Sequence, residues 1–183
     1  MALQGKVRII GGQWRSRLVT FPDLADLRPT PDRIRETLFN WLGQDLSGLS
    51  CLDLFAGSGV LGFEAASRGA KQVVMVESDA RAFKALQENK AKLHAAQIQL
   101  VRINALEFIA SDLQHFDIVF LDPPYRLELL PKLLPLLSTH LEKDAQVYIE
   151  TKGAWIPDNQ WHVRRSGRAG AIYYQLIELG IHG

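Results

Sequence analysis

The chain has 183 residues, of which 47% are hydrophobic and 22% charged, and its formal net charge is +1. This composition excludes a disordered or low-complexity chain, and the length fits one domain (residues 1–183) with a sizeable core. No apolar run is long enough to span a membrane, and the N-terminus lacks a secretory signal, so we expect a cytoplasmic protein. The single cysteine, Cys51, excludes an internal disulfide and favours a buried structural thiol.

Charge is unevenly distributed along the chain. Residues 1–35 hold seven basic and three acidic side chains. Residues 36–150 hold ten basic and fifteen acidic side chains, and residues 151–183 hold four basic and two acidic ones. Basic ends around an acidic middle predict that the termini build a surface for a polyanion, while the central part holds a cationic cofactor. The alternative is an ordinary solvated face.

Two short segments near the N-terminus alternate as strands do. Residues 6–10 and 17–21 flank a glycine-containing connection and predict a β-hairpin, so that residues 1–30 form an extension and residues 31–183 the core. Its cations and one tryptophan would offer phosphate contacts and an aromatic surface to structured RNA. The predicted RNA-binding residues are Lys6, Arg8, Trp14, Arg15, Arg17 and Arg28. The alternative is a solvated hairpin edge.

A helix is predicted over residues 32–42, where apolar side chains recur at helical spacing. Thr30 could cap this helix, with Pro31 at its first position.

Residues 50–69 have the pattern of strand, turn and helix. Residues 51–55 form a short apolar run, glycines permit a tight turn, and residues 60–67 carry apolar side chains at helical spacing, with Gly69 as the C-cap. A glycine turn before a helix leaves backbone N–H groups open to a ligand. We therefore expect a small polar molecule to bind there.

Asp53 helps to decide which molecule binds. Residues 57–62 satisfy the dinucleotide pattern G-x-G-x-x-G, and an acidic residue, Glu77, follows about 20 residues later. The Asp53 carboxylate would repel a pyrophosphate but attract an ammonium and a sulfonium. S-adenosylmethionine carries both groups, and Glu77 would bind its ribose hydroxyls. The alternative is an ordinary turn with a solvated aspartate.

Strand and helix patterns alternate through the rest of the chain, which predicts a doubly wound α/β sheet with its site at the carboxyl ends of the strands. The predicted strands are residues 73–77, 98–103, 116–121, 145–150, 161–165 and 171–178, and the predicted helices are residues 79–93, 106–111 and 127–141. Pro131 and Pro135 predict a late start or a kink in the last helix. Residues 167–170 are predicted to link the last two strands.

The strand at residues 116–121 runs directly into the tetrapeptide Asp122-Pro123-Pro124-Tyr125. An exocyclic purine amine is a poor nucleophile, so a catalyst must hold its N–H bonds and aim the nitrogen. The Asp122 carboxylate and the Pro123 carbonyl can each accept one N–H, and Tyr125 offers a ring face to a flipped-out base. Alone, such a tetrapeptide is often only a turn. The five histidines show no ligand spacing, so no metal is predicted.

The phrases LDLFAGSG at residues 52–59 and VVMVE at residues 73–77 resemble the first two motifs of class I S-adenosylmethionine-dependent methyltransferases. The segment RPTPDRIRETLFNWL at residues 28–42 resembles the bacterial 16S ribosomal RNA guanine-N2 methyltransferases, and the likeness extends over almost the whole chain. It implies a Rossmann-like seven-stranded sheet with the last strand antiparallel. The implied substrate is the N2 amine of the guanine at position 966 of 16S ribosomal RNA, in the assembled small subunit. We expect a monomer.

The resemblance also implies roles for individual residues. Thr30 and Arg33 would lie near the carboxylate of the cofactor, and Asn104 with Ala105 would lie at the adenine ring, where many relatives carry aspartate in place of Asn104. The Asn104 side-chain oxygen could still accept from the adenine amino group. The expected cofactor residues are Asp53, Phe55, Gly57, Ser58, Gly59, Glu77, Asn104, Ala105, Thr30 and Arg33, and the expected catalytic residues are Asp122, Pro123 and Tyr125.

Three other functions are compatible with parts of this pattern. An adenine-N6 DNA methyltransferase would use the same tetrapeptide, but usually carries a separate target-recognition domain. A glutamine-N5 methyltransferase of release factors would be expected to have asparagine in place of Asp122. A non-catalytic RNA-binding module would not need every cofactor and acceptor position to be filled, as they are here.

Overall fold

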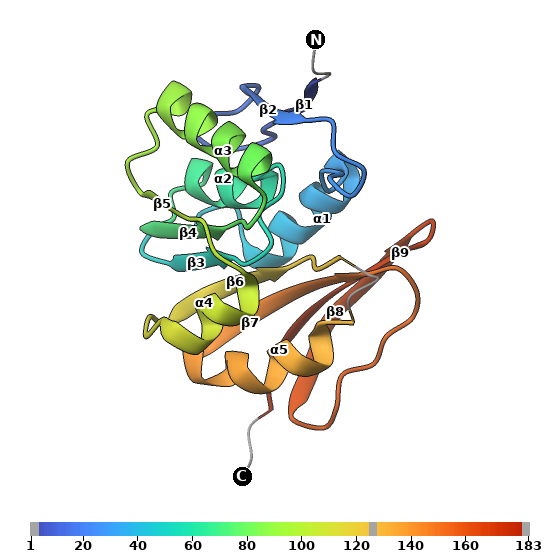
Figure 1. Cartoon of the computed structure of the whole chain (residues 1–183). Helices are drawn as coiled ribbons and strands as arrows, with labels where there is room; N and C mark the ends of the chain where they lie inside the picture. The colour runs from blue at the N-terminus through green and yellow to red at the C-terminus, as the bar shows by residue number, and fades with distance from the viewer. Residues whose placement is uncertain (1–3, 125–127, 181–183) are drawn as a thin grey trace.

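Figure 1 shows a computed structural model of the chain, which describes residues 4–124 and 128–180. The elements, in chain order, are β1 (Gln4–Arg8), β2 (Leu18–Pro22), α1 (Asp32–Leu42), β3 (Ser50–Asp53), α2 (Val60–Ser67), β4 (Gln72–Val76), α3 (Ala80–Leu93), β5 (Ile98–Val101), α4 (Ala105–Ser111), β6 (Phe116–Leu121), α5 (Leu130–Leu137), the 3-10 helix η2 (Ser138–His140), β7 (Leu141–Thr151), β8 (Trp161–Ala169) and β9 (Ile172–Leu179). No helix among these residues is both long and apolar enough to cross a membrane.

Seven strands form one sheet in the order β5-β4-β3-β6-β7-β9-β8. The pairs from β5 to β7 are parallel, whereas β9 is antiparallel to both of its neighbours, β7 and β8. This confirms the predicted class I arrangement and its antiparallel last strand. The strand order reverses between β3 and β6, and ligands of doubly wound sheets bind at such a reversal, beyond the carboxyl ends of the strands.

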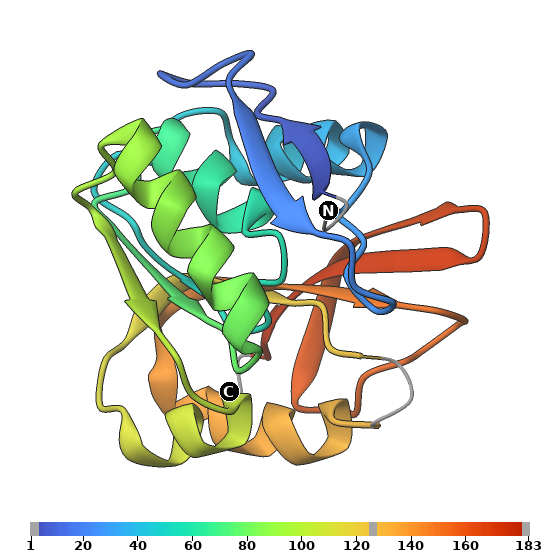
Figure 2. The ribbon, with the colours of Figure 1, turned by 45° about the horizontal axis from the view of Figure 1, so that its top comes forward.

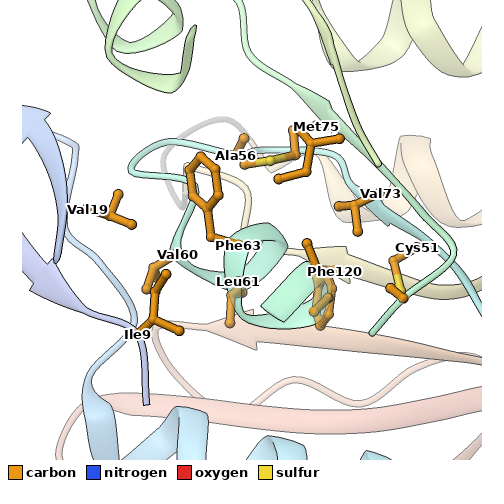
Figure 3. Close-up of a cluster of buried hydrophobic side chains, with 14 of the residues drawn as sticks. Ile9, Val19, Cys51, Ala56, Val60, Leu61, Phe63, Val73, Met75 and Phe120 are labelled. Carbon is orange, nitrogen blue, oxygen red and sulfur yellow. The ribbon is translucent and has the colours of Figure 1, made fainter. Parts of the chain in front are cut away.

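Helices cover both faces of this sheet. Figures 1 and 2 show α1, α2 and α3 on one face and α4 with α5 on the other. Two buried apolar clusters correspond to these faces. In the first, part of which Figure 3 shows, Ile9 and Val19 from the N-terminal hairpin segment share one cluster with Val60 of α2 and with Met75 and Phe120 of the sheet. The hairpin therefore contributes to the same core as the sheet.

Buried polar contacts fix the N-terminal hairpin in place. The Asn89 side chain of α3 accepts from the Thr20 backbone N–H at 3.2 Å and donates to the Thr20 carbonyl at 2.7 Å. On α2, the fully buried Glu64 accepts the Ile10 N–H at 2.8 Å. Glu64 is also paired with Arg35 and Arg68, each at 3.0 Å. Because an uncompensated buried charge is costly, these groups hold one another in a single arrangement.

Arg35 connects several segments through one buried guanidinium. Besides Glu64, it donates to the Arg8 carbonyl at 2.8 Å, to the Thr30 carbonyl at 2.8 Å and to the Asp32 carboxylate. It therefore ties the hairpin, the linker before α1 and helix α2 together.

Two predicted details of the N-terminal part are wrong. The structure contradicts an aromatic surface at Trp14, because this side chain is only 4% exposed and belongs to the first cluster. The connection between β1 and β2 folds over the end of α2, where the Trp14 backbone N–H donates to the Ser67 hydroxyl at 2.9 Å. Thr30 does not cap α1 either, since the capping position is Pro31 and makes no side-chain hydrogen bond.

The C-terminal strands are longer than predicted. β7 begins at Leu141, and β8 continues to Ala169, so residues 167–170 are mostly strand. Gly167 lies in β8 beside the Tyr174 ring, where a Cβ would be 2.5 Å from that ring, so only glycine fits there. Helix α5 starts late, as predicted, with Pro131 near its first position and Pro135 inside it.

Candidate active site

Four acidic side chains gather where four neighbouring strands end. Asp53 is the last residue of β3, Glu77 follows β4, Asp122 follows β6, and Glu150 is the second-last residue of β7. Because these strands are parallel, their carboxyl ends meet at one edge of the sheet. The described residues include no group of three or more His, Cys, Asp or Glu side chains suited to hold a metal ion.

Glu77 braces the glycine turn. Its Oε1 accepts the Gly57 N–H at 2.9 Å, and its Oε2 accepts the Asp79 N–H at 2.8 Å. Each carboxylate oxygen has two acceptor positions, so both oxygens can accept a further hydrogen bond from a hydroxyl. Glu77 therefore shapes the turn and remains able to bind a diol.

The glycines of the turn serve different purposes. Gly57 has a φ of 55°, and a Cβ there would have no neighbour closer than 3.9 Å, so this position is open to a ligand. Gly59 has a φ of 83°, and a Cβ would be 2.5 Å from Leu86. At Gly62, a Cβ would likewise be 2.9 Å from the Met75 side chain. Of the three, only Gly57 is open to a bound molecule, whereas Gly59 and Gly62 allow α2 to pack closely.

Asp53 is buried, with 3% of its surface exposed, and its Oδ2 accepts the Gly62 N–H at 3.1 Å. Burial raises the pKa of Asp53 to about 7, the Gly62 hydrogen bond opposes this, and the charge of Glu77 adds to it. A cation beside this carboxylate would favour its ionised form.

Asp122 and Glu150 form a second pair. The register places Leu121 opposite Ile149, so these two acids follow on adjacent strands. Burial raises the pKa of Asp122 well above its usual range, and the charges of Glu150 and Asp53 raise it further. Burial also raises the pKa of Glu150, against the effect of its hydrogen bonds.

The linker before α1 is attached to this second pair. Glu150 is 4% exposed, and its Oε2 accepts from the Thr30 hydroxyl at 3.1 Å and from the Tyr148 hydroxyl at 3.2 Å. The Thr30 carbonyl in turn accepts from Arg35. The Thr30 hydroxyl thus lies at the candidate site with its donor engaged by Glu150, and its contact with the cofactor carboxylate stays a prediction.

The other predicted cofactor residues lie around the same edge. The exposed Asn104 caps α4, and its Oδ1 accepts from the backbone N–H groups of the next two residues at 2.8 and 3.3 Å. That oxygen is therefore partly occupied, and adenine binding by Asn104 stays a prediction. Phe55 is half-buried above the second cluster, while Ala105 and Ser58 are buried, and Arg33 is exposed at the start of α1.

Pro123 is buried directly after Asp122. Tyr125 lies outside the described residues.

The predicted RNA-binding cations do not lie together. Lys6, Arg8 and Arg28 are exposed on the hairpin and its linker. The Arg17 guanidinium donates to the Lys92 carbonyl at 3.2 Å, at the end of α3, and Arg15 lines a surface pocket of about 480 Å³ with residues of α1 and the end of α2. Because α2 and α3 begin at the acidic edge and run away from it, Arg15 and Arg17 lie toward the opposite edge of the sheet.

Residues 7–178 match the protein family described as conserved hypothetical protein 95. The chain is 42% identical to ribosomal RNA small subunit methyltransferase D of Escherichia coli, over 98% of this chain and 93% of that protein. The chain belongs to the ribosomal RNA small subunit methyltransferase D family. The protein of this name in Haemophilus influenzae is 39% identical, over 96% and 95% of the two chains. A solved structure from Escherichia coli has a TM-score of 0.85 at 41% identity, over 96% of this chain and 98% of that one.

For this methyltransferase D family member, sequence patterns missed Glu150. The available signal was an acid at the end of the apolar run VYIE, the position that Asp53 and Glu77 occupy in their own strands. Cys51 is buried and unpaired, as predicted, and burial raises the pKa of its thiol to about 12. It is therefore a structural thiol and not a nucleophile.

Proposed function

We propose that this chain transfers a methyl group from S-adenosylmethionine to the N2 amine of a guanine in 16S ribosomal RNA, at position 966 by family resemblance. One observation carries the proposal. The Asp122-Pro123 acceptors follow β6 directly, at the edge where the buried Asp53 and the Glu77-braced turn lie on the neighbouring strands β3 and β4. A methyl donor and an amine would thus be held side by side.

The residues present fit a cationic nucleoside cofactor. Asp53 is a buried carboxyl without a cationic partner among the described residues, so an ammonium or sulfonium placed beside it would relieve its unfavourable charge. Gly57 is open to a ligand backbone, and Glu77 keeps acceptor positions for ribose hydroxyls. When bound, S-adenosylmethionine supplies an electrophilic methyl carbon on its sulfonium.

The chain's own task is to prepare the amine. The ionised Asp122 carboxylate accepts one N–H of the guanine amine and the Pro123 carbonyl accepts the other, which directs the nitrogen lone pair at the methyl carbon. The new N–C bond would form as the S–C bond breaks, and the proton that the amine loses would pass to the accepting Asp122 carboxylate and from there to solvent. Protonated Asp122 is a weaker acceptor and cannot take up the proton that the amine loses, so the raised pKa of this group makes the reaction depend on pH.

Two finer points belong to the proposal. The physical substrate is the assembled small subunit, and the enzyme acts as a monomer. The exposed cations of the N-terminal hairpin, including Lys6 and Arg8, are proposed to contact RNA phosphates.

Two measurements test the proposed function. Calorimetry should show saturable binding of S-adenosylmethionine and none of NAD. Mass spectrometry of ribosomal RNA nucleosides from cells with and without the gene should show that N2-methylguanosine depends on the gene. Loss of N6-methyladenosine instead would indicate an adenine methyltransferase, and unchanged nucleosides would contradict the RNA substrate.

A further inference from the structure

The tip of the β8–β9 hairpin lies at the active-site edge of the sheet. β9 pairs antiparallel with β7, with Tyr174 opposite Glu150, and β8 carries Arg168 opposite Tyr173. The turn between β8 and β9 therefore lies beyond the carboxyl end of β7, at the edge that also holds Asp122. Figures 1 and 2 show this hairpin projecting from the body of the molecule.

This hairpin is basic from the middle of β8 to the turn, and the stretch of residues 165–173 is called the tip. No acidic residue occurs between Asp158 and Glu178, whereas Arg164, Arg165 and Arg168 fall within that stretch. Arg164, next to Arg165 in the middle of β8, is paired with Glu178 at 3.3 Å. Arg165 and Arg168 are exposed and have no acidic partner among the described residues. The tip thus presents two uncompensated guanidinium groups.

Arg168 is held in a defined orientation. Its guanidinium carbon lies 4.9 Å from the centre of the Tyr173 ring, and its Nε donates to the Gly170 carbonyl at 2.9 Å. Its two terminal nitrogens make no hydrogen bond within the described residues. A planar guanidinium stacked on an aromatic ring suits both phosphate contact and stacking with an unpaired base.

The hairpin is also anchored to the body of the protein. The Tyr174 ring stacks on Trp41 of α1, with ring centres 5.4 Å apart, and Gly167 of β8 packs against the same ring. Ala169 and Ile172 at the turn contact the first cluster. A tip held in this way loses little freedom when it binds a partner.

We propose that the tip of the β8–β9 hairpin, through Arg165, Arg168 and Tyr173, binds the RNA strand next to the target nucleotide. Residues 165 and 168 point to opposite faces of β8, and β8 is the edge strand, so an RNA backbone that crosses this edge can reach both. The guanidinium groups contact phosphates, and Tyr173 with Arg168 supports an unpaired base. The inference rests on the proposed RNA substrate and names a surface for it.

The decisive variant is Arg165→Ala/Arg168→Ala, tested by fluorescence anisotropy with a labelled 16S ribosomal RNA transcript across a salt series. We expect weaker binding by about tenfold or more at low salt, and a slope of log affinity against log salt that is shallower by about two units. S-adenosylmethionine affinity, measured by calorimetry, should not change. Tyr173→Ala should weaken binding by about tenfold in a way that salt does not alter.

Three matched variants separate the role of the tip from charge removal in general. Arg164→Ala removes a cation from the same strand that already has an acidic partner, and should leave binding unchanged. Arg15→Ala/Arg17→Ala removes two cations near the opposite edge, and should weaken binding less than the tip variant. Arg168→Lys keeps the charge but loses the planar group, so it should preserve the salt slope while lowering affinity.

A tip variant with wild-type affinity and wild-type salt slope would overturn the inference, whatever the methylation result. Normal RNA binding with weak binding to small subunits would also overturn it, because the tip would then face a ribosomal protein. Methyl transfer is measured on the same transcript and on subunits. A wild-type protein that binds RNA through the tip but methylates neither would contradict the proposed function and leave the tip inference standing.

Discussion

The two carboxylate pairs of the site are held in different ways. Asp53 and Glu77, on the cofactor side, accept backbone N–H groups that belong to the glycine turn and its helices. Glu150, on the substrate side, accepts only side-chain hydroxyls, and Asp122 accepts no hydrogen bond within the described residues. The Asp53–Glu77 pair is therefore shaped before any ligand arrives, whereas Asp122 has an open acceptor, for which we propose the substrate amine as the partner.

The largest effect is expected for Asp122→Ala. Removing the acceptor should lower the rate of methyl transfer on the order of a thousandfold and leave S-adenosylmethionine affinity within about tenfold, because the lost contact is to the amine. Single-turnover transfer to small subunits and cofactor calorimetry measure the two quantities. Asp122→Asn, which keeps one acceptor oxygen, should retain more activity, and near-normal turnover in the alanine variant would contradict the acceptor mechanism.

Asp53→Asn should have the next largest effect. It should change the affinity for S-adenosylmethionine and not the rate of methyl transfer. The amide keeps an acceptor for the Gly62 N–H but loses the charge that attracts a cationic cofactor, so the dissociation constant should rise about 10- to 100-fold. The transfer rate at saturating cofactor should stay close to that of the wild type. A variant that binds normally but transfers slowly would show that the two pairs are not separable.

A smaller effect is expected for Glu150→Gln. Because the charge of Glu150 raises the pKa of Asp122, its removal should lower that pKa, and the rise of activity with pH should move to lower pH. The variant should thus be several-fold more active, relative to its own maximum, on the acid side of the profile. The amide oxygen can still accept from Thr30.

The control for this profile is Glu142→Gln, an exposed acid at the other end of β7. Its pH profile should match that of the wild type. A Glu150→Gln profile that also matches would show that this carboxylate does not tune Asp122.

The smallest effect concerns protons released during cofactor binding. Since the free protein holds the pKa of Asp53 at about 7, this group is mostly protonated at pH 6 and must ionise beside a cation. Binding should therefore release nearly one proton at pH 6 and almost none above pH 8, and affinity should rise with pH up to about 7. Calorimetry in buffers of different ionisation enthalpy measures this release, and Asp53→Asn should abolish it.

The features that sequence predicted well are those encoded within short segments. The positions of the glycine turn, Asp53 and the Asp122-Pro123 pair were predictable because each lies at or directly after the end of an apolar strand, so position along the chain fixes position in space. The parallel sheet follows from the alternation of strand and helix patterns along the chain, since parallel strands joined by helices have few possible arrangements.

The features that sequence missed depend on distant partners. Glu150 meets Thr30 across 120 residues, and Glu64 meets Ile10 across 54. Trp14 looked like an exposed turn residue because nothing local shows that its loop folds over α2. Gly167 looked like a turn because its packing partner, the Tyr174 ring, is recognisable only once β8 and β9 are paired.

The contact between Thr30 and Glu150 has a consequence for the order in which the protein can assemble during synthesis. The N-terminal hairpin leaves the ribosome first, but Glu64, Asn89 and Glu150, which hold it and its linker, are added later. At about 5–20 residues per second, the 120 residues between Thr30 and Glu150 take on the order of ten seconds to translate. During that interval the Thr30 hydroxyl lacks its Glu150 partner, whereas Glu64 and Asn89, which hold the hairpin, become part of the chain before Glu150 does.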